Sequence, residues 1–122
     1  MAYPVAFDFL PNGDYILTLK GSNSFPTTPG TALIRMYTAA GTLIGTYYDL
    51  SDSCNSDFER GLLGICVDPN YSTNNYIYAY YNHRYNNDER IRVVRFTTVG
   101  NVGTNPTLIF DLDVANNIPG NH

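Results

Sequence analysis

The hydrophobic and polar positions of this chain alternate in short runs that predict β-strands rather than helices. Asn12-Gly13 lies between the first two runs, and it is a strong hairpin signal because both residues tolerate positive φ. A loop at 21–30, rich in Ser, Thr, Pro and Gly, and a turn at 39–42 separate the next runs. The first part of the chain therefore predicts four strands joined as a meander, at 5–10, 15–19, 32–38 and 43–48.

A second set of four strand-like runs follows a polar connection, with turns predicted at 68–75 and 101–105 and a loop at 82–89. The predicted strands are 61–67, 76–81, 90–97 and 107–112. Corresponding strands of the two sets lie roughly 55–65 residues apart, a spacing in the range of long propeller blades. The pattern divides the chain into a blade-like unit at 4–49, a connecting acidic loop at 50–60, a second blade-like unit at 61–113 and the start of a third unit at 114–122.

Composition and charge narrow the class of protein. Eleven Tyr, six Phe and ten Gly among 122 residues favour strands separated by turns. A net charge of −4 and a pI near 4.8 leave no basic stripe to neutralise phosphates, so we expect no nucleic-acid partner. No apolar run approaches the roughly 20 residues that a membrane span needs. The sequence predicts a soluble, all-β chain without a membrane span.

The two cysteines, Cys54 and Cys66, leave two interpretations open. In an oxidising compartment they could form a disulfide that closes a short loop. Alternatively, Cys66 is a small core residue of a strand and Cys54 is a free thiol in a loop.

The stretch from Glu59 to Tyr71 is the most specific pattern in the chain, because an apolar strand at 61–67 runs directly into a tight turn. A strand at 91–96 and the final segment 118–122 follow in the same order. Together these segments resemble the start of the glucose/sorbosone dehydrogenase family, whose members are sugar-oxidising quinoproteins built as β-propellers. The resemblance implies an all-β fold of two four-stranded antiparallel meander sheets, similar to the first two blades of a six-bladed propeller.

The resemblance also implies roles for three residues. His122 corresponds to the catalytic base of the family, and an imidazole with an ordinary pKa near 6.5 suits that role at neutral pH. Glu59 corresponds to a position that can contact the quinone, and Asn121, beside His122, to a position that contacts either the cofactor or a residue that binds it in the parent. For an intact parent the resemblance implies pyrroloquinoline quinone (PQQ) and calcium as cofactors, a sugar substrate, hydride transfer from the anomeric carbon to the quinone, and a separate electron acceptor.

The 122-residue fragment alone is predicted to bind no cofactor and to be inactive, because the family supplies an anion-stabilising Arg and a cofactor clamp from later blades. Members of the family are generally exported. The resemblance therefore implies an extracellular or periplasmic location, although the N-terminus lacks the basic region and apolar core of a signal peptide.

One position departs from the family, because some members carry an amide where this chain has Glu59. A carboxylate beside the quinone oxygens is repulsive unless Arg60 or a cation offsets it. The alternative is a local salt bridge between Glu59 and Arg60, or a charge of the loop without a role at the cofactor.

Acidic residues of the same region could recruit calcium, but they lack the Gly-punctuated spacing of a dedicated site, which favours a solvated loop. These residues are Asp49, Asp52, Asp57 and Glu59. The oxygen-rich segment 86–88 is a weak cluster of the same kind. His83 has no second His or Cys at metal-ligand spacing, so we expect no zinc site.

Two blades do not close a propeller, since known propellers use about 4–8 blades. Either the natural chain continues beyond His122, or the eight strands pack as a sandwich, or the fragment assembles with others, and the resemblance favours the first. A second class of function is a non-catalytic, secreted, β-rich binding or self-assembling module, adhesive or filament-forming. Such a module would associate through its open strand edges.

Overall fold

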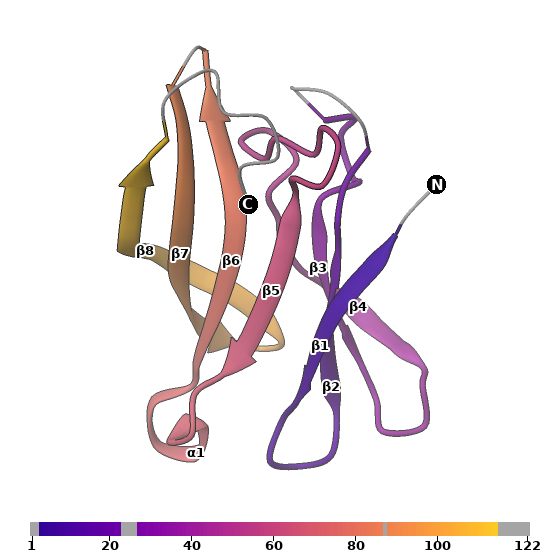
Figure 1. Cartoon of the computed structure of the whole chain (residues 1–122). Coiled ribbons are helices and arrows are strands. Elements are labelled where there is room, and N and C mark those ends of the chain that lie inside the picture. Colours follow the sequence, from indigo (N-terminus) through magenta and orange to yellow (C-terminus); the bar gives the residue numbers. More distant parts are fainter. Residues whose placement is uncertain (1–2, 23–26, 87, 115–122) are drawn as a thin grey trace.

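In the computed structural model, which describes residues 3–22, 27–86 and 88–114, the chain forms two four-stranded antiparallel sheets (Figure 1). The first sheet contains β1 (Pro4–Phe9), β2 (Tyr15–Leu19), β3 (Leu33–Tyr37) and β4 (Leu43–Asp49), paired in that order. The second contains β5 (Leu62–Val67), β6 (Tyr76–Tyr85), β7 (Asp88–Val99) and β8 (Val102–Asp113), also in order. A short helix, α1 (Tyr71–Asn74), connects β5 to β6.

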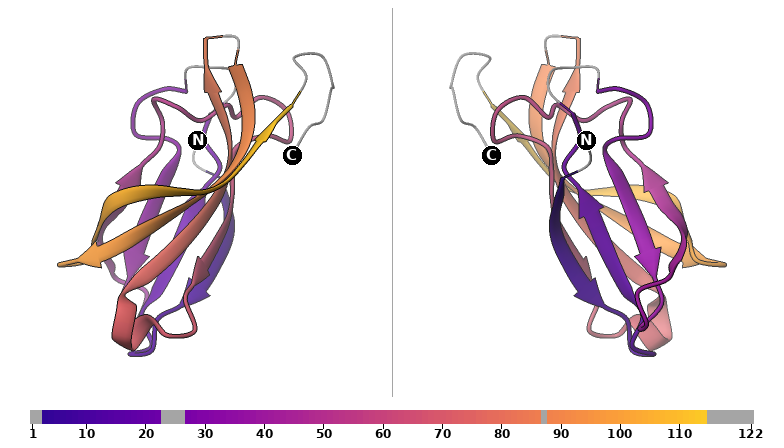
Figure 2. Two further views of the ribbon diagram at one scale, coloured as in Figure 1. Left: turned by 90° about the vertical axis from the view of Figure 1, so that its left-hand side faces the viewer. Right: turned by 90° about the vertical axis from the view of Figure 1, so that its right-hand side faces the viewer.

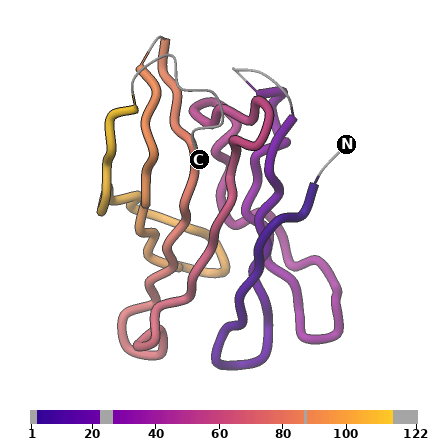
Figure 3. The backbone as a smooth tube through the Cα atoms, in the orientation of Figure 1, coloured from indigo at the N-terminus to yellow at the C-terminus, as the bar shows by residue number. Residues whose placement is uncertain are grey.

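The backbone trace in Figure 3 completes one meander before it begins the other. This topology confirms the predicted all-β class and the two predicted meanders. Within the described residues, no helix has the length and apolar character needed to cross a membrane.

Two segments that the sequence predicts as connections between strands belong largely to strands in the structure. β6 and β7 remain paired out to Tyr85 and Asp88, so the predicted loop at 82–89 is wrong. Polar side chains of this hairpin find partners across the ladder, as where Nη1 of Arg84 lies 3.3 Å from Oε1 of Glu89. β8 begins at Val102, earlier than predicted. A polar composition does not distinguish a loop from a solvent-facing hairpin. In the hairpin, the backbone N–H and C=O groups form hydrogen bonds with the paired strand.

The two sheets pack face to face around one shared core (Figure 2). Residues two apart on a strand share a face, so each sheet presents one apolar row to the other. The fully buried residues of these rows include Ile16, Ile34, Met36, Ile77 and Phe96. The Phe96 ring lies 4.5 Å from the Tyr48 ring and 5.9 Å from the Tyr47 ring, measured between centroids.

Two side-chain hydrogen bonds join strands of the two sheets. The Tyr47 hydroxyl of β4 lies 2.8 Å from Oγ1 of Thr98 on β7. The backbone N–H of Val67 on β5 donates to Oδ2 of Asp8 on β1, at 2.7 Å, where these two strands lie side by side (Figure 1). The pair of bonds fixes the orientation of the sheets beyond what apolar burial alone specifies.

Both cysteines are free, so the disulfide interpretation is wrong. The alternative interpretation is also corrected, because Cys54 is the buried core residue and Cys66 is exposed. Cys66 pairs with Tyr78 on the face of the second sheet that points away from the first sheet. Cys54 becomes buried because its loop folds across the end of the core, which local strand alternation does not reveal.

Alkaline pH is expected to destabilise the fold through Cys54 and Tyr47. Burial raises the pKa of each group to about 12, from 9.0 for the thiol and 10.0 for the phenol. Above pH 9 the unfolded chain therefore binds fewer protons than the folded one, and the free energy of unfolding falls as pH rises toward 12. Each group contributes a slope of up to about 1.4 kcal/mol per pH unit.

Urea unfolding between pH 8 and 11 measures this slope, and the comparison of wild type with Cys54→Ala isolates the contribution of the thiol. The Cys54→Ala variant is expected to show a shallower pH dependence. Equal slopes for the two proteins would contradict a buried, protonated thiol.

Candidate functional site

The loop at 50–60 lies across the end of the core at which β5 begins (Figure 1). Main-chain bonds attach it to the β6–β7 hairpin. The N–H of Asn55 donates to the carbonyl oxygen of Asn82 at 2.8 Å, and the N–H of Arg84 donates to that of Ser53 at 2.9 Å. Cys54 and His83 form an isolated antiparallel bridge between these two bonds. The loop is therefore held as a short extra strand on the second sheet.

Lys20, at the end of β2, fastens the same loop to the first sheet. Its Nζ donates to the carbonyl oxygens of Ser56, at 3.2 Å, and Phe58. In return, the Ser56 hydroxyl donates to the Lys20 carbonyl oxygen at 2.9 Å, and the N–H of Leu62 donates to the same oxygen at 3.1 Å. The only lysine of the chain thus serves as a structural clamp, a role that the sequence does not reveal.

Two buried amide side chains complete the framework. Asn55 is 1% exposed, and its Nδ2 donates to Oε1 of Glu89 at 3.0 Å. Oδ1 of Asn82 accepts the N–H of Gly61 at 3.2 Å. Sequence analysis missed both residues, because a polar residue beside a turn is ordinarily exposed, and only the folded loop shows that these two are buried.

Gly61 is a residue at which this end of the molecule is closely packed. Its φ is +150°, and a Cβ atom there would lie 2.6 Å from both the carbonyl oxygen and Cγ of Lys20. We expect Gly61→Ala to lower the free energy of unfolding by about 1–3 kcal/mol, because both the backbone conformation and the Lys20 main chain resist the new methyl group.

Gly45→Ala on β4 is the matched control, since a Cβ atom at Gly45 would meet no atom within 4 Å. Urea titrations of Gly61→Ala and Gly45→Ala measure the difference between their free energies of unfolding. A Gly61→Ala protein as stable as Gly45→Ala would show that the Lys20 contact is not tight in solution.

Glu59 lies in the exposed turn that leads into β5. The turn is closed by the N–H of Arg60, which donates to the Asp57 carbonyl oxygen at 3.0 Å. Phe58 has φ of 53° and is 77% exposed. The clamp by Lys20 holds the backbone on both sides of Glu59 at this end of the molecule. His122 and Asn121 lie outside the described residues.

Comparison with known proteins identifies the family. The family model described as Glucose / Sorbosone dehydrogenase matches residues 1–122. This chain belongs to that family. No curated protein matched the sequence.

Two solved structures show the fold of this family member. One is described as "Crystal structure of glucose dehydrogenase", with a TM-score of 0.71, 14% identity, and coverage of 91% of this chain and 30% of that chain. The other, "glucose dehydrogenase", has a TM-score of 0.70 and 14% identity, and the match covers 89% of this chain and 30% of that chain. Glucose dehydrogenases are β-propellers, so the two packed sheets correspond to adjacent blades. The chain spans about 30% of the length of these structures.

Two acidic residues of the predicted clusters have local partners in the structure. No group of three His, Cys, Asp or Glu side chains that could hold an ion occurs in the described part of the chain. Asp49 accepts the N–H of Ser51 at 2.9 Å, and Asp88, from the segment 86–88, is engaged by Arg90 at 3.0 Å. The carboxylates of Asp49 and Asp88 therefore interact with groups close to them in the sequence.

His83 lies where the loop meets the β6–β7 hairpin. Its Nδ1 is buried without a hydrogen-bond partner, and burial lowers the pKa of the imidazole, so the neutral form is favoured. Its ring packs edge-on against Tyr81, at 6.1 Å between centroids. We conclude that His83 is a packing residue of the loop–hairpin junction.

The described residues do not by themselves form a site for the quinone cofactor of this family. PQQ is an anion with several carboxylates, whereas the side chain that the loop places at this end, Glu59, is itself an acid, and the Lys20 ammonium is engaged by loop carbonyls.

Proposed function

We propose that this chain is part of a quinoprotein sugar dehydrogenase that oxidises the anomeric carbon of an aldose. The observation that carries the proposal is the family match over the whole of residues 1–122. Family membership further supports PQQ and calcium as cofactors of the intact parent, a sugar as substrate, a separate electron acceptor, and an extracellular or periplasmic location. The fold is consistent with this assignment, because it supplies two blades of the propeller on which such sites are built.

In the proposed reaction the imidazole of His122 removes the proton from the hydroxyl on the anomeric carbon, and the C–H electron pair leaves as hydride. When bound, PQQ supplies the acceptor for that hydride. Asn121 and Glu59 are proposed to lie at the edge of the cofactor. In this arrangement, the loop at 50–60 acts as a rigid support that holds Glu59 beside the start of β5.

A dye-reduction assay of the intact protein with PQQ, calcium and a panel of aldoses tests this function. We expect dye reduction that depends on both the aldose and PQQ. The 122-residue chain alone is expected to show none. Absence of turnover in an intact protein shown to bind PQQ would exclude the dehydrogenase assignment, and sugar oxidation by the 122-residue chain would contradict the requirement for further blades.

Glu59→Gln is expected to tighten PQQ binding by about fivefold. Two like charges 4 Å apart repel by about 1 kcal/mol in water, and removing one of them converts to that factor. Fluorescence titration of PQQ into intact wild-type protein and the intact Glu59→Gln variant measures the ratio of the two dissociation constants. Asp52→Asn is the matched control, because Asp52 is an exposed acid of the same loop. If Glu59→Gln left the affinity unchanged, or if Asp52→Asn tightened it equally, Glu59 would not contact the cofactor.

A second candidate function is a non-catalytic binding or self-assembling module. It is favoured by large apolar side chains left exposed on the outward faces of both sheets, among them Phe7 at 60% and Phe110 at 49%. Exposed apolar patches of this kind mark interaction surfaces. The outward faces of the sheets, together with the open strand edges, are therefore the surfaces through which such a module would bind a partner or another copy.

A further inference from the structure

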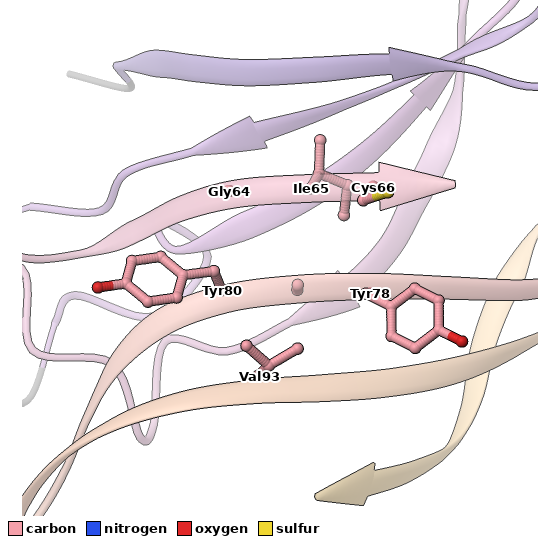
Figure 4. A pocket seen from close by; sticks show the side chains of 7 residues that line it. Gly64, Ile65, Cys66, Tyr78, Tyr80 and Val93 are labelled. Atoms are coloured by element: carbon pink, nitrogen blue, oxygen red, sulfur yellow. The ribbon is translucent and has the colours of Figure 1, made fainter. Parts of the chain in front are cut away.

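His83 points from β6 toward the inward face of the second sheet, at the end of the core that the loop at 50–60 covers. Residues of β6 alternate between the two faces of the sheet. Tyr78 and Tyr80 lie on either side of a hollow on the outward face (Figure 4), whereas Tyr81 is buried on the inward face. His83 follows Tyr81 by two residues in an unbroken ladder, so the two side chains share the inward face.

The loop at 50–60 places Cys54 directly opposite His83. This pair lies between the two main-chain hydrogen bonds that attach the loop to β6, which is the arrangement of a non-hydrogen-bonded antiparallel pair. In such a pair the facing side chains lie closest together. The Cys54 side chain is fully buried, and because burial raises the pKa of its thiol to about 12, the thiol is neutral. The loop therefore covers one side of the imidazole with an uncharged group.

On its other side, His83 faces two cations of β7. Arg90 pairs directly with His83 across the ladder, and Arg92, two residues further along β7, shares the same face. Like charges placed directly opposite one another on neighbouring strands are destabilising. A positive charge on the imidazole would therefore be opposed by the Arg90 guanidinium, and also by that of Arg92.

The acidic groups on this face are already engaged by the two arginines. Nε of Arg90 lies 3.0 Å from Oδ2 of Asp88, and Nε of Arg92 lies 3.0 Å from Oδ1 of Asp111. Asp111 also accepts a bond from Nη1 of Arg90 at 2.8 Å, and Oδ2 of Asp113 lies 4.0 Å from Nη2 of Arg90. These carboxylates attract an imidazolium only weakly, because the guanidinium groups balance their charge.

The position of Nδ1 adds to the cost of protonating His83. This atom is buried, and no described group forms a hydrogen bond with it. A protonated imidazole donates from both ring nitrogens, whereas the neutral ring needs only one acceptor. Protonation would therefore create a buried N–H without an acceptor, which is unfavourable. Burial, followed by the charge of Arg92, lowers the pKa of the imidazole in the folded chain, in agreement with this geometry.

We propose that protonation of His83 releases the loop at 50–60 from β6, so that acid opens this junction while the rest of the fold stays closed. Once the Cys54 edge leaves β6, the imidazole meets water and regains its ordinary pKa of about 6.5. The open form then binds more protons than the closed form below that pH, and the closed form loses stability as the pH falls. Lys20 still attaches the loop to the first sheet, because its bonds do not involve His83.

This inference goes beyond the proposed sugar oxidation and does not rest on it, because every group involved lies within the described residues. The same loop leads to Glu59, so in the proposed dehydrogenase its support for that residue would weaken in acid. A loop that opens in acid in a protein without dehydrogenase activity would leave the inference standing. Activity in a protein whose loop does not respond to pH would leave only the proposed function standing.

Amide hydrogen exchange followed by NMR at pH 7.5 and 5.5 tests the proposal. The reporters are the amides of Asn55 and Arg84, which donate the two bonds between the loop and β6. Their protection factors, corrected for the intrinsic exchange rate at each pH, are expected to fall by up to about tenfold. That is the effect of one added proton on the opening equilibrium when the pKa of the open form is about 6.5. Unchanged protection of the two reporters, or an equal loss in β3, which is paired on both sides, would overturn the proposal.

Two histidine variants show which residue takes up the proton. His83→Phe retains a ring that can pack against Tyr81 but cannot be protonated, so the protection of the loop is expected to be independent of pH. His122→Gln is the matched control, because His122 is the other histidine of the 122 residues, and this variant should lose protection as wild type does. Persistence of the loss in His83→Phe, or its disappearance in His122→Gln, would contradict the proposal.

Arg90→Met tests the opposing charge. Without Arg90, the carboxylates of Asp88 and Asp111 are less fully balanced and stabilise an imidazolium at His83, so we expect a smaller loss of protection in acid than in wild type. A loss equal to or larger than that of wild type would contradict the opposition of the two charges.

Circular dichroism checks that each variant is folded. Should His83→Phe fail to fold, NMR titration of the His83 ring protons in wild type decides the same question. The ring is expected to titrate below its ordinary pKa, in step with the loss of protection at Asn55. A His83 ring that titrates at or above that pKa, or one that titrates without any change at Asn55, would overturn the proposal.

Discussion

Replacing Phe96 with alanine is expected to lower the free energy of unfolding by about 3–5 kcal/mol, the range typical of a Phe truncated in a core. Phe96 is fully buried and packs against the rings of Tyr47 and Tyr48 from the opposite sheet. Its removal leaves a cavity between the sheets and loses both aromatic contacts. A domain of this size is stable by about 5–15 kcal/mol, so the loss is a large part of the total.

Urea unfolding of wild type and Phe96→Ala at one protein concentration measures this effect, since association would make stability depend on concentration. Val99→Ala is the matched control. It lies on the same strand but is 62% exposed, and we expect a change within about 0.5 kcal/mol. Similar stabilities for the two variants would show that the sheets do not share the packed core described above.

If the proposed reaction holds, His122→Asn in the intact parent is expected to lower kcat for aldose oxidation by about 10²–10⁴-fold, the contribution of a well-placed general base. Asparagine retains a polar side chain of similar reach but cannot accept the proton at neutral pH. PQQ binding should change little, because the proposed base acts on the substrate hydroxyl and not on the cofactor.

The pH profile separates a base from a residue that only supports the structure. With wild type, kcat/KM is expected to fall on the acid side as the base becomes protonated, and the variant should lose that limb. Asn121→Ala serves as the comparison, since a residue that contacts the cofactor should weaken PQQ binding and retain the acid limb. An unchanged profile in His122→Asn would exclude His122 as the base.

Much of the architecture was predictable because strands and turns have local signatures. The Asn12-Gly13 hairpin and the apolar run that begins at Gly61 indicated their elements directly, and both lie where expected. The extended β6–β7 hairpin was not predictable, because Arg84 and Glu89 resemble loop residues until the opposite strand provides their partners. The same reason hid the hydrogen bond from buried Asn55 to Glu89.

The candidate site was predictable only where a motif carried it. Glu59 and the start of β5 follow from the resemblance between this chain and its family, whereas Lys20 belongs to no motif and acts from the other sheet. The clamp joins Lys20 to residues 36 and 38 positions away. No local pattern specifies a contact of that sequence separation.

The sequence by itself determined the all-β class, the two meanders and the family, because period-two alternation, turn residues and a contiguous motif are local properties. The tertiary structure decided which face of each sheet is covered, why Cys54 rather than Cys66 is buried, and how the loop at 50–60 is held. Alternation along a strand defines two faces but does not say which face meets another sheet. That choice depends on contacts between residues far apart in the chain, such as the bond from Val67 to Asp8.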